Sequence, residues 1–140
     1  SKGLGCPVGS ILIGDESIME DAIRVRKVLG GGMRQIGILA AAGLYALDHH
    51  LARLAEDHQK AKDIEAVLHA CSFVKSIVPV QTNIVIFELN DGVDAQEIVN
   101  KLAEKNITIS GMGQGKLRIV THLDYSDPMH EQVLSALKNL

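Results

Sequence analysis

The amino-acid sequence predicts a mixed α/β chain, with a helix-rich first part and a small α+β second part. Apolar residues recur at helical spacing up to about residue 70. Beyond that point, β-branched runs alternate with turn residues and with two shorter helical patterns. A length of 140 residues suits one compact domain, but the change of pattern near residues 50–70 separates two pieces.

The composition is that of a globular protein. Hydrophobic residues make up 46% of the chain and charged residues 22%, so a core can form and intrinsic disorder is excluded. The net charge of −3 provides no basic surface for nucleic acid or for an anionic membrane. No apolar run approaches the roughly 18 residues that a membrane span needs. The two cysteines, Cys6 and Cys71, fit a reducing compartment, so we expect a cytoplasmic protein.

Glycines separate the first elements. The apolar run from Val8 to Ile13 follows a glycine-rich turn and predicts a buried strand. Asp15 is a suitable N-cap for a helix that continues through about Leu29. Three consecutive glycines, residues 30–32, then end that helix.

The longest helical pattern runs from Met33 to about Ala70. Its apolar residues form one stripe at spacings of three and four. A single helix of this length would exceed roughly 25 residues, which is unusual in a globular protein. We therefore expect either a break or bend around Asp48 to His50, or one long helix that bridges two domains.

The second half has the order strand, helix, strand, turn, strand, helix, which predicts an α+β sheet with helices over one face. The glycine-rich segment 111–115 is expected to be the turn. The expected strands are 73–80, 82–89, 107–109 and 117–121, and the expected helices are 94–105 and 128–140.

Two groups of basic residues are candidates for chemistry, one for a reaction with a carbonyl group and one for anion binding. Lys2 precedes a Gly-Leu-Gly turn, where a desolvated lysine could react with a carbonyl group; spacing alone favours an exposed lysine at a frayed terminus. Arg34 follows the three glycines, and together they resemble an anion cradle; a flexible linker fits the pattern equally well. Lys27 could add charge to the same place or belong to a solvated helix face.

Arg118 stands in the middle of an otherwise apolar strand. Burial of an arginine requires an anionic partner, and a protein carboxylate is the favoured choice over the carboxylate of a substrate. His122 and Asp124 follow on the same strand end, where alternation points both side chains the same way. We expect a structural hydrogen bond between them.

Other polar residues carry weaker signals. His49, His50 and His58 do not show the spacing of a metal site, and we expect no bound metal. Cys6 lies in a glycine-rich turn without a neighbouring histidine, so it is interpreted as a small packing residue rather than a reactive thiol.

Several sequence blocks carry a family resemblance. They are residues 1–10 (SKGLGCPVGS), 26–35 (RKVLGGGMRQ), 43–47 (GLYAL), Thr82-Asn83 and 118–122 (RIVTH). In this order they resemble the low-specificity L-threonine aldolases, which are pyridoxal-phosphate enzymes of the aspartate-aminotransferase-like fold (fold type I). The resemblance covers essentially the whole chain.

The resemblance implies a carboxyl-terminal fragment that starts at the Schiff-base lysine. Residues 1–57 would be the end of the large cofactor-binding domain with its linking helix, and residues 58–140 the small α+β domain. The implied reaction is retro-aldol cleavage of threonine or allo-threonine to glycine and acetaldehyde by a homo-oligomer, a dimer or tetramer. The chain alone is expected to be inactive, because the first half of the enzyme supplies other cofactor contacts.

The resemblance also assigns roles to single residues. Lys2 would form the Schiff base with pyridoxal 5′-phosphate, and Arg118 would clamp the α-carboxylate of the amino-acid substrate. Arg34 would lie near the cofactor phosphate, reaching into the site of a neighbouring subunit, and Lys27 would lie at the same site. Two alternatives remain open: a β-eliminating lyase on the same fold, and a non-catalytic α+β module for carboxylate binding or assembly.

Overall fold

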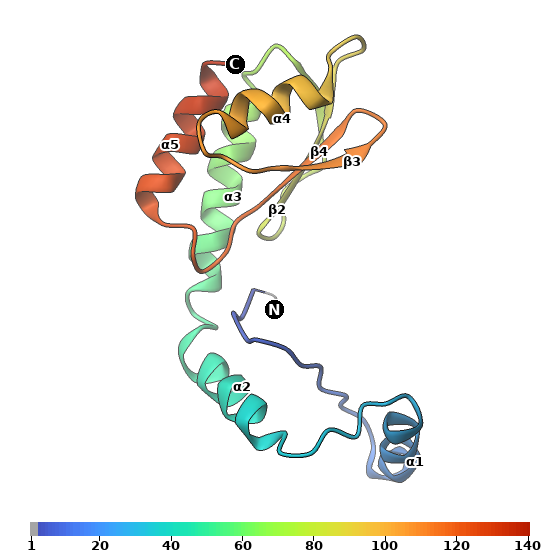
Figure 1. Ribbon diagram of the computed structural model, residues 1–140. Helices are drawn as coiled ribbons and strands as arrows, with labels where there is room; N and C mark the ends of the chain where they lie inside the picture. The colour runs from blue at the N-terminus through green and yellow to red at the C-terminus, as the bar shows by residue number, and fades with distance from the viewer. Residues whose placement is uncertain (1–2) are drawn as a thin grey trace. The chain divides into compact units, whose positions relative to one another are not determined.

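The computed structural model describes residues 3–140. The chain forms two compact units that divide between Leu51 and Ala52, here called unit 1 and unit 2 (Figure 1). The family resemblance implied a domain boundary after residue 57, and that boundary stays a prediction. None of the helices among the described residues is long and apolar enough to cross a membrane.

Unit 1 contains two helices, α1 (Glu16–Val28) and α2 (Gly37–His49). The predicted buried strand at residues 8–13 is wrong, because these residues are exposed and form no strand. A buried strand needs paired neighbours, and the described part of unit 1 contains no other strand. Within unit 1, Ala46 is the one described residue that is buried.

Glycines end α1 as predicted. Gly30 has a φ of 82°, which a glycine adopts without strain. Its N–H donates to the carbonyl oxygen of Lys27 at 3.1 Å, and the N–H of Gly31 donates to that of Arg26 at 2.8 Å. This pair of hydrogen bonds is a Schellman motif. At the other end Asp15 is the N-cap residue, as predicted, but its side chain forms no capping hydrogen bond.

The long helical pattern is interrupted close to Asp48 to His50, which was one of the two predicted alternatives. Helix α2 ends at His49, and α3 begins at Leu54 and runs to Leu68. The alternative of one continuous helix is therefore wrong. The two helices differ in character, because α2 is apolar on most sides whereas α3 buries one face.

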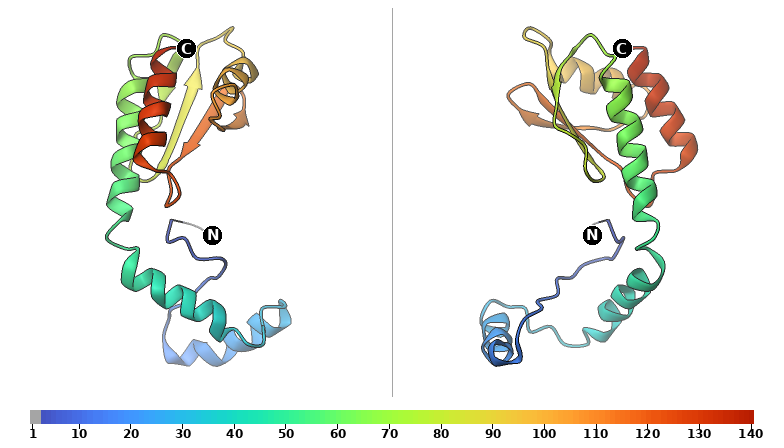
Figure 2. Two further views of the ribbon diagram at one scale, coloured as in Figure 1. Left: turned by 60° about the vertical axis from the view of Figure 1, so that its left-hand side comes forward. Right: turned by 180° about the vertical axis from the view of Figure 1, so that it is seen from behind.

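Unit 2 is a four-stranded antiparallel sheet with three helices packed on it (Figures 1 and 2). The strand order is β1-β2-β4-β3, and α3 and α5 run side by side. The strands are β1 (Val74–Ile77), β2 (Ile84–Leu89), β3 (Ser110–Gly113) and β4 (Lys116–Val120), and the other helices are α4 (Ala95–Ala103) and α5 (Asp127–Lys138).

The position of β3 differs from the prediction. Residues 107–109 were expected to form the strand and residues 111–115 the turn, but β3 occupies Ser110–Gly113. The turn is confined to Gln114 and Gly115, both with positive φ, 52° and 69°. Positive φ at both central residues is typical of the type I′ turn that closes two-residue hairpins. The tight turn therefore leaves the preceding glycines free to pair with β4.

The helices cover one face of the sheet and leave the other open. Strand β2 buries Val85, Phe87 and Leu89, and β4 buries Leu117 and Ile119. These residues form one core with α3, α4 and α5. The opposite side, here called the open face, carries the alternate residues of both strands: Ile84, Ile86, Glu88, Lys116, Arg118 and Val120.

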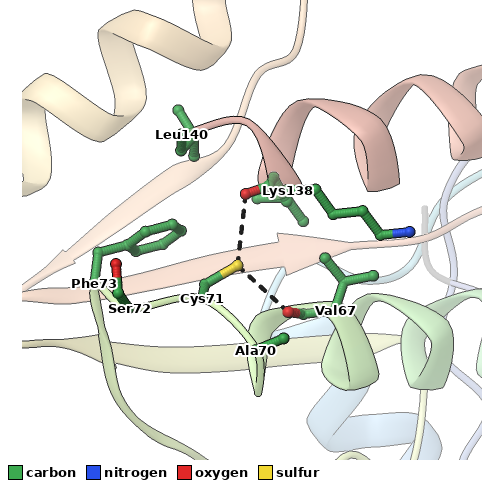
Figure 3. A pocket seen from close by; sticks show the side chains of 8 residues that line it. Val67, Ala70, Cys71, Ser72, Phe73, Lys138 and Leu140 are labelled. Carbon is green, nitrogen blue, oxygen red and sulfur yellow. Dashed lines mark hydrogen bonds between the residues drawn. The ribbon is translucent and has the colours of Figure 1, made fainter.

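Cys71 lies beside the carboxyl-terminal ends of α3 and α5 (Figure 3). Its thiol lies 3.3 Å from the carbonyl oxygen of Val67 on α3 and 3.5 Å from that of Leu137 on α5. Burial raises the pKa of the Cys71 thiol, which favours the neutral form. The side chain lines a cavity of about 290 Å³ together with Phe73 and Leu140. It therefore connects α3 and α5 as a small packing residue.

Candidate functional site

Arg118 lies at the centre of the open face. It is exposed on β4, between the buried residues Leu117 and Ile119. Its neighbours across the sheet are Ile86 on β2 and Ser110 on β3. The sequence interpretation of a buried arginine is wrong, because β4 is covered on one face only.

The favoured protein carboxylate for Arg118 is also wrong among the described residues, whose ion pairs do not include this arginine. The one carboxylate of the open face, Glu88, binds Lys75 instead, at 3.0 Å. The hydrogen bond from Lys75 lowers the pKa of Glu88, and the same contact raises the pKa of Lys75. Glu88 also lies opposite Lys116 in the strand register. The guanidinium of Arg118 thus has no carboxylate partner among the described residues, which suits the binding of an external anion.

His122 and Asp124 do not form the expected side-chain hydrogen bond. The His122 Nδ1 atom lies 3.9 Å from the Asp124 carboxylate, which is beyond hydrogen-bonding distance. Instead the backbone N–H of Asp124 donates to Nδ1 at 3.2 Å. Nδ1 is therefore the acceptor of this hydrogen bond. Both side chains are exposed.

The basic residues of unit 1 flank the end of α1. Lys27 lies in its last turn, and Arg34 lies in the turn that precedes α2; both are exposed. No ion pair among the described residues involves either. The N–H groups of Gly30 and Gly31 serve the helix cap, so these two groups are not available to an anion. A Cβ at residue 31 would lie 2.9 Å from the Cγ of Arg26, which explains the second glycine.

Lys2 lies outside the described residues, but the turn that follows it is held on α2. The carbonyl oxygen of Leu4 lies 2.6 Å from the Nδ1 atom of His50. A carbonyl can only accept, so Nδ1 carries the proton. The Cys6 thiol lies 3.9 Å from the carbonyl oxygen of Ala42, which agrees with a packing role. Among the described residues no group of three or more His, Cys, Asp or Glu side chains could hold a metal ion.

A polar network at the start of α3 was not anticipated from the sequence. The carboxylate of Asp57, fully buried, accepts two hydrogen bonds from Arg53 at 2.7 and 3.1 Å. The Asp57 carbonyl oxygen accepts a hydrogen bond from the Thr121 hydroxyl at 2.7 Å. The spacing of four between Arg53 and Asp57 on a helix is the signal that could have predicted the ion pair.

A second network joins α3, α5 and the segment before α5. The Tyr125 hydroxyl lies 3.1 Å from His130 Nδ1, and His130 Nε2 lies 3.2 Å from Asp63. Lys60 donates to the Tyr125 carbonyl oxygen at 2.9 Å and pairs with Asp127 at 2.7 Å. Burial raises the pKa of Tyr125 to about 12. The residues come from distant parts of the sequence, so no local pattern reveals them.

Comparisons with known proteins agree with this architecture. The family model described as beta-eliminating lyase matches residues 1–91. Low-specificity L-threonine aldolase 1 of Arabidopsis thaliana is 42% identical over 125 residues, covering 87% of this chain and 35% of that protein. The low specificity L-threonine aldolase of Escherichia coli (strain K12) is 41% identical over 126 residues, covering 90% of this chain and 36% of that protein.

Solved structures share the fold at low identity. A decarboxylase from Sulfurospirillum multivorans superposes with a TM-score of 0.61 at 17% identity, over 83% of this chain and 36% of that one. An ornithine aminotransferase from Toxoplasma gondii superposes with a TM-score of 0.57 at 19% identity, over 72% of this chain and 25% of that one. The predicted fold class, the carboxyl-terminal part of an aminotransferase-like fold with a small antiparallel sheet, is thereby confirmed. The chain spans little more than a third of the length of the two aldolases that it matches.

Proposed function

Because this chain belongs to the beta-eliminating lyase family, we propose that it supplies the carboxyl-terminal part of a pyridoxal-phosphate-dependent lyase. The proposed reaction is the cleavage of threonine or allo-threonine to glycine and acetaldehyde. The names of the two aldolases at 41% and 42% identity support this choice of reaction. The remaining cofactor contacts would come from the part of the relatives that this chain does not match, so the chain alone would be inactive.

Arg118 carries the proposal on the structural side. Its guanidinium is exposed on a rigid strand, and no carboxylate of the described residues pairs with it. A guanidinium presents two parallel N–H donors that match the two oxygens of an α-carboxylate. Arg118 would bind the substrate carboxylate and thereby orient the bond that breaks.

The basic residues of unit 1 fit the chemistry of pyridoxal 5′-phosphate. Lys27 and Arg34 are exposed cations without a partner among the described residues, which suits a phosphate group. Lys2 would hold the cofactor covalently through its amine, and the Leu4–His50 contact lies in the segment that follows it in the sequence. When bound, the cofactor supplies the electron sink for cleavage next to the amino group.

Unit 1 also supports assembly into a homo-oligomer, a dimer or tetramer. Its apolar side chains are mostly exposed, including Ile11 (79%), Ile13 (88%) and Leu29 (80%). Exposed apolar surface of this extent indicates an interface, which the rest of the enzyme and a second copy would cover. The free thiols of Cys6 and Cys71 support a reducing compartment, the cytoplasm.

Product analysis tests the reaction. The enzyme that contains this chain, supplied with pyridoxal 5′-phosphate and L-threonine, is expected to release glycine and acetaldehyde in equal amounts. Lys2→Ala is expected to abolish both the reaction and the visible absorbance of the covalently held cofactor. Arg118→Lys should raise KM for threonine, because a single ammonium replaces a bidentate donor pair.

The β-eliminating alternative has one specific observation in its favour, the description of the family model. β-Elimination from threonine would release ammonia and a four-carbon 2-oxo acid, without glycine. These products would overturn the aldolase assignment and leave the lyase class intact. An enzyme that binds no cofactor and tolerates Lys2→Ala would instead support a non-catalytic module.

A further inference from the structure

The register between β2 and β4 decides where Arg118 lies, and no turn connects these two strands. Helix α4 and strand β3 separate them in the sequence. A slip by one residue is excluded, because it would turn Arg118 into the core. A slip by two residues keeps the alternation of buried and exposed side chains. It would move Arg118 along the open face by about 7 Å.

Strand β3 contributes less to the register of β4 than β2 does. All four of its residues are exposed, although it packs beside α4 and directly follows the buried core residue Ile109. Its pairing with β4 is interrupted by an irregularity between Gly111 and Gly113. The two-residue turn ties β3 to β4, so the hairpin would move as one piece.

Hydrogen bonds of Thr121 hold the end of β4 in one register, among them a 3.4 Å contact of its hydroxyl with the carbonyl oxygen of Asn83. The Thr121 N–H donates to the carbonyl oxygen of Asn83 at 3.0 Å, and the Asn83 side-chain amide donates back to the Thr121 carbonyl oxygen at 2.7 Å. The Thr121 hydroxyl donates to the carbonyl oxygen of Asp57 on α3 at 2.7 Å. We call these contacts the Thr121 bracket. Arg53 in turn holds the Asp57 carboxylate.

The Thr121 bracket is selective for one register because of the side chains on either side. A slip by two residues would bring Ile119 or Leu123 to the place of Thr121. Neither has a hydroxyl group to donate to α3. The slip would therefore lose the hydrogen bond of a fully buried side chain and place the hydroxyl elsewhere.

We propose that Thr121 and Asn83 are positioning residues for Arg118, which hold β4 in the register that places the guanidinium at the substrate carboxylate. The inference rests on the proposed function, because that function assigns the carboxylate to Arg118. Neither residue touches the substrate. Their effect on substrate binding passes through the β2–β4 register.

Kinetics of the cofactor-loaded enzyme test this role. Thr121→Val and Asn83→Ala should each raise KM for threonine by roughly three- to tenfold, the equivalent of one lost hydrogen bond. The kcat should fall as KM rises, because a displaced guanidinium also misorients the bond that breaks. Thr121→Ser keeps the hydroxyl and should retain the wild-type KM.

Asn90→Ala is the matched control. Its side-chain amide donates to the Ser72 carbonyl oxygen at 2.7 Å, at the opposite end of β2 and away from β4. This variant loses the same kind of hydrogen bond as Asn83→Ala but should leave KM unchanged. If KM rose equally in Asn83→Ala and Asn90→Ala, the effect would come from a general loss of stability, and the proposal would be overturned.

Two further measurements separate this inference from the proposed function. In an Arg118→Ala background, Thr121→Val should add nothing to KM, because no charged group is left at this position of β4. Amide hydrogen exchange of the 140-residue chain should be faster across β2 and β4 in Thr121→Val than in Thr121→Ser. Equal exchange overturns the bracket. If Arg118→Lys raises KM and Thr121→Val does not, the positioning role of Thr121 is wrong, whereas the proposed function stands. If Arg118→Lys leaves KM unchanged, the proposed binding of the substrate carboxylate by Arg118 is itself wrong.

Discussion

Units 1 and 2 use apolar residues in opposite ways. Unit 2 buries a continuous core that includes Ile64, Phe87, Leu102 and Leu117, each with no exposed surface. Unit 1 contains many large apolar side chains, yet Ala46 is the one buried residue among those described. The salt bridges among the described residues all belong to unit 2. The N-cap residues of both helices of unit 1 form no side-chain capping hydrogen bond.

This difference separates the sources of stability in the two units. Burial of apolar surface is the dominant favourable term in folding, and only unit 2 has it within this chain. The helices of unit 1, each 13 residues long, are of a length that is marginal in water without tertiary packing. Unit 2 should therefore determine the free energy of unfolding that is measured for the chain.

Truncation of a core side chain is expected to have the largest effect. Phe87→Ala should lower the free energy of unfolding by about 3–5 kcal/mol, because it leaves a cavity in a fully buried site. Ile13→Ala, at an apolar residue of unit 1 that is 88% exposed, should change it by less than about 0.5 kcal/mol. Urea unfolding followed by circular dichroism measures both. A loss above about 2 kcal/mol in Ile13→Ala would show that unit 1 has a core after all.

The buried ion pair of α3 ranks next. Asp57→Ala removes a fully buried carboxylate and leaves Arg53, whose side chain is 17% exposed, without its partner. The expected loss in the free energy of unfolding is about 3 kcal/mol. Asp21→Ala, at an exposed position of α1 that has no ion pair with the residues that the structure describes, is the control in unit 1 and should be nearly neutral. Similar losses in both variants would contradict the conclusion that unit 2 determines the free energy of unfolding.

Much of unit 2 could be predicted from the sequence because its elements have strong local signals. Helix α4 has an aspartate N-cap and an apolar face, and β2 is a β-branched run; both were found close to their predicted places. The strand expected at residues 8–13 was wrong for the opposite reason. An apolar run indicates burial, but burial depends on neighbouring strands that a local pattern does not contain.

The residues of the candidate site also divide into those that the sequence could predict and those that it could not. Arg118 could be singled out because an arginine among apolar strand residues is conspicuous in the sequence. Its exposure could not be predicted, since that depends on which face of the sheet the helices cover. The Thr121 bracket was missed because Asn83, Thr121 and Asp57 come from distant segments and meet only in the folded unit. The place of Lys2 remains a prediction.

Helix capping offers a smaller test of the comparison, because both units contain an aspartate N-cap. The Asp94 side chain accepts a hydrogen bond from the Gln96 N–H at 2.8 Å, whereas Asp15 accepts none. Asp94→Ala should therefore cost about 1 kcal/mol in the free energy of unfolding. Asp15→Ala should cost a few tenths at most, through the helix dipole alone. Equal losses, measured by thermal unfolding, would mean that Asp15 caps α1 in solution.

The two tyrosines give the smallest expected effect, one that appears only at high pH. Burial raises the pKa of Tyr125 from 10 to about 12, so the folded state holds this proton more tightly than the unfolded state. The corresponding stability is fully present below pH 10 and is lost as the pH rises from 10 to 12. Tyr125 is half-buried, so solvent screening reduces this contribution to about 1 kcal/mol or less.

Tyr125→Phe should show a shallower fall in the free energy of unfolding over this range than the wild type. Tyr45→Phe removes a tyrosine of unit 1 that is 59% exposed and should retain the wild-type slope. If Tyr45→Phe flattened the slope instead, the phenol of unit 1 would be buried in solution, and the contrast between the units would not hold at this residue.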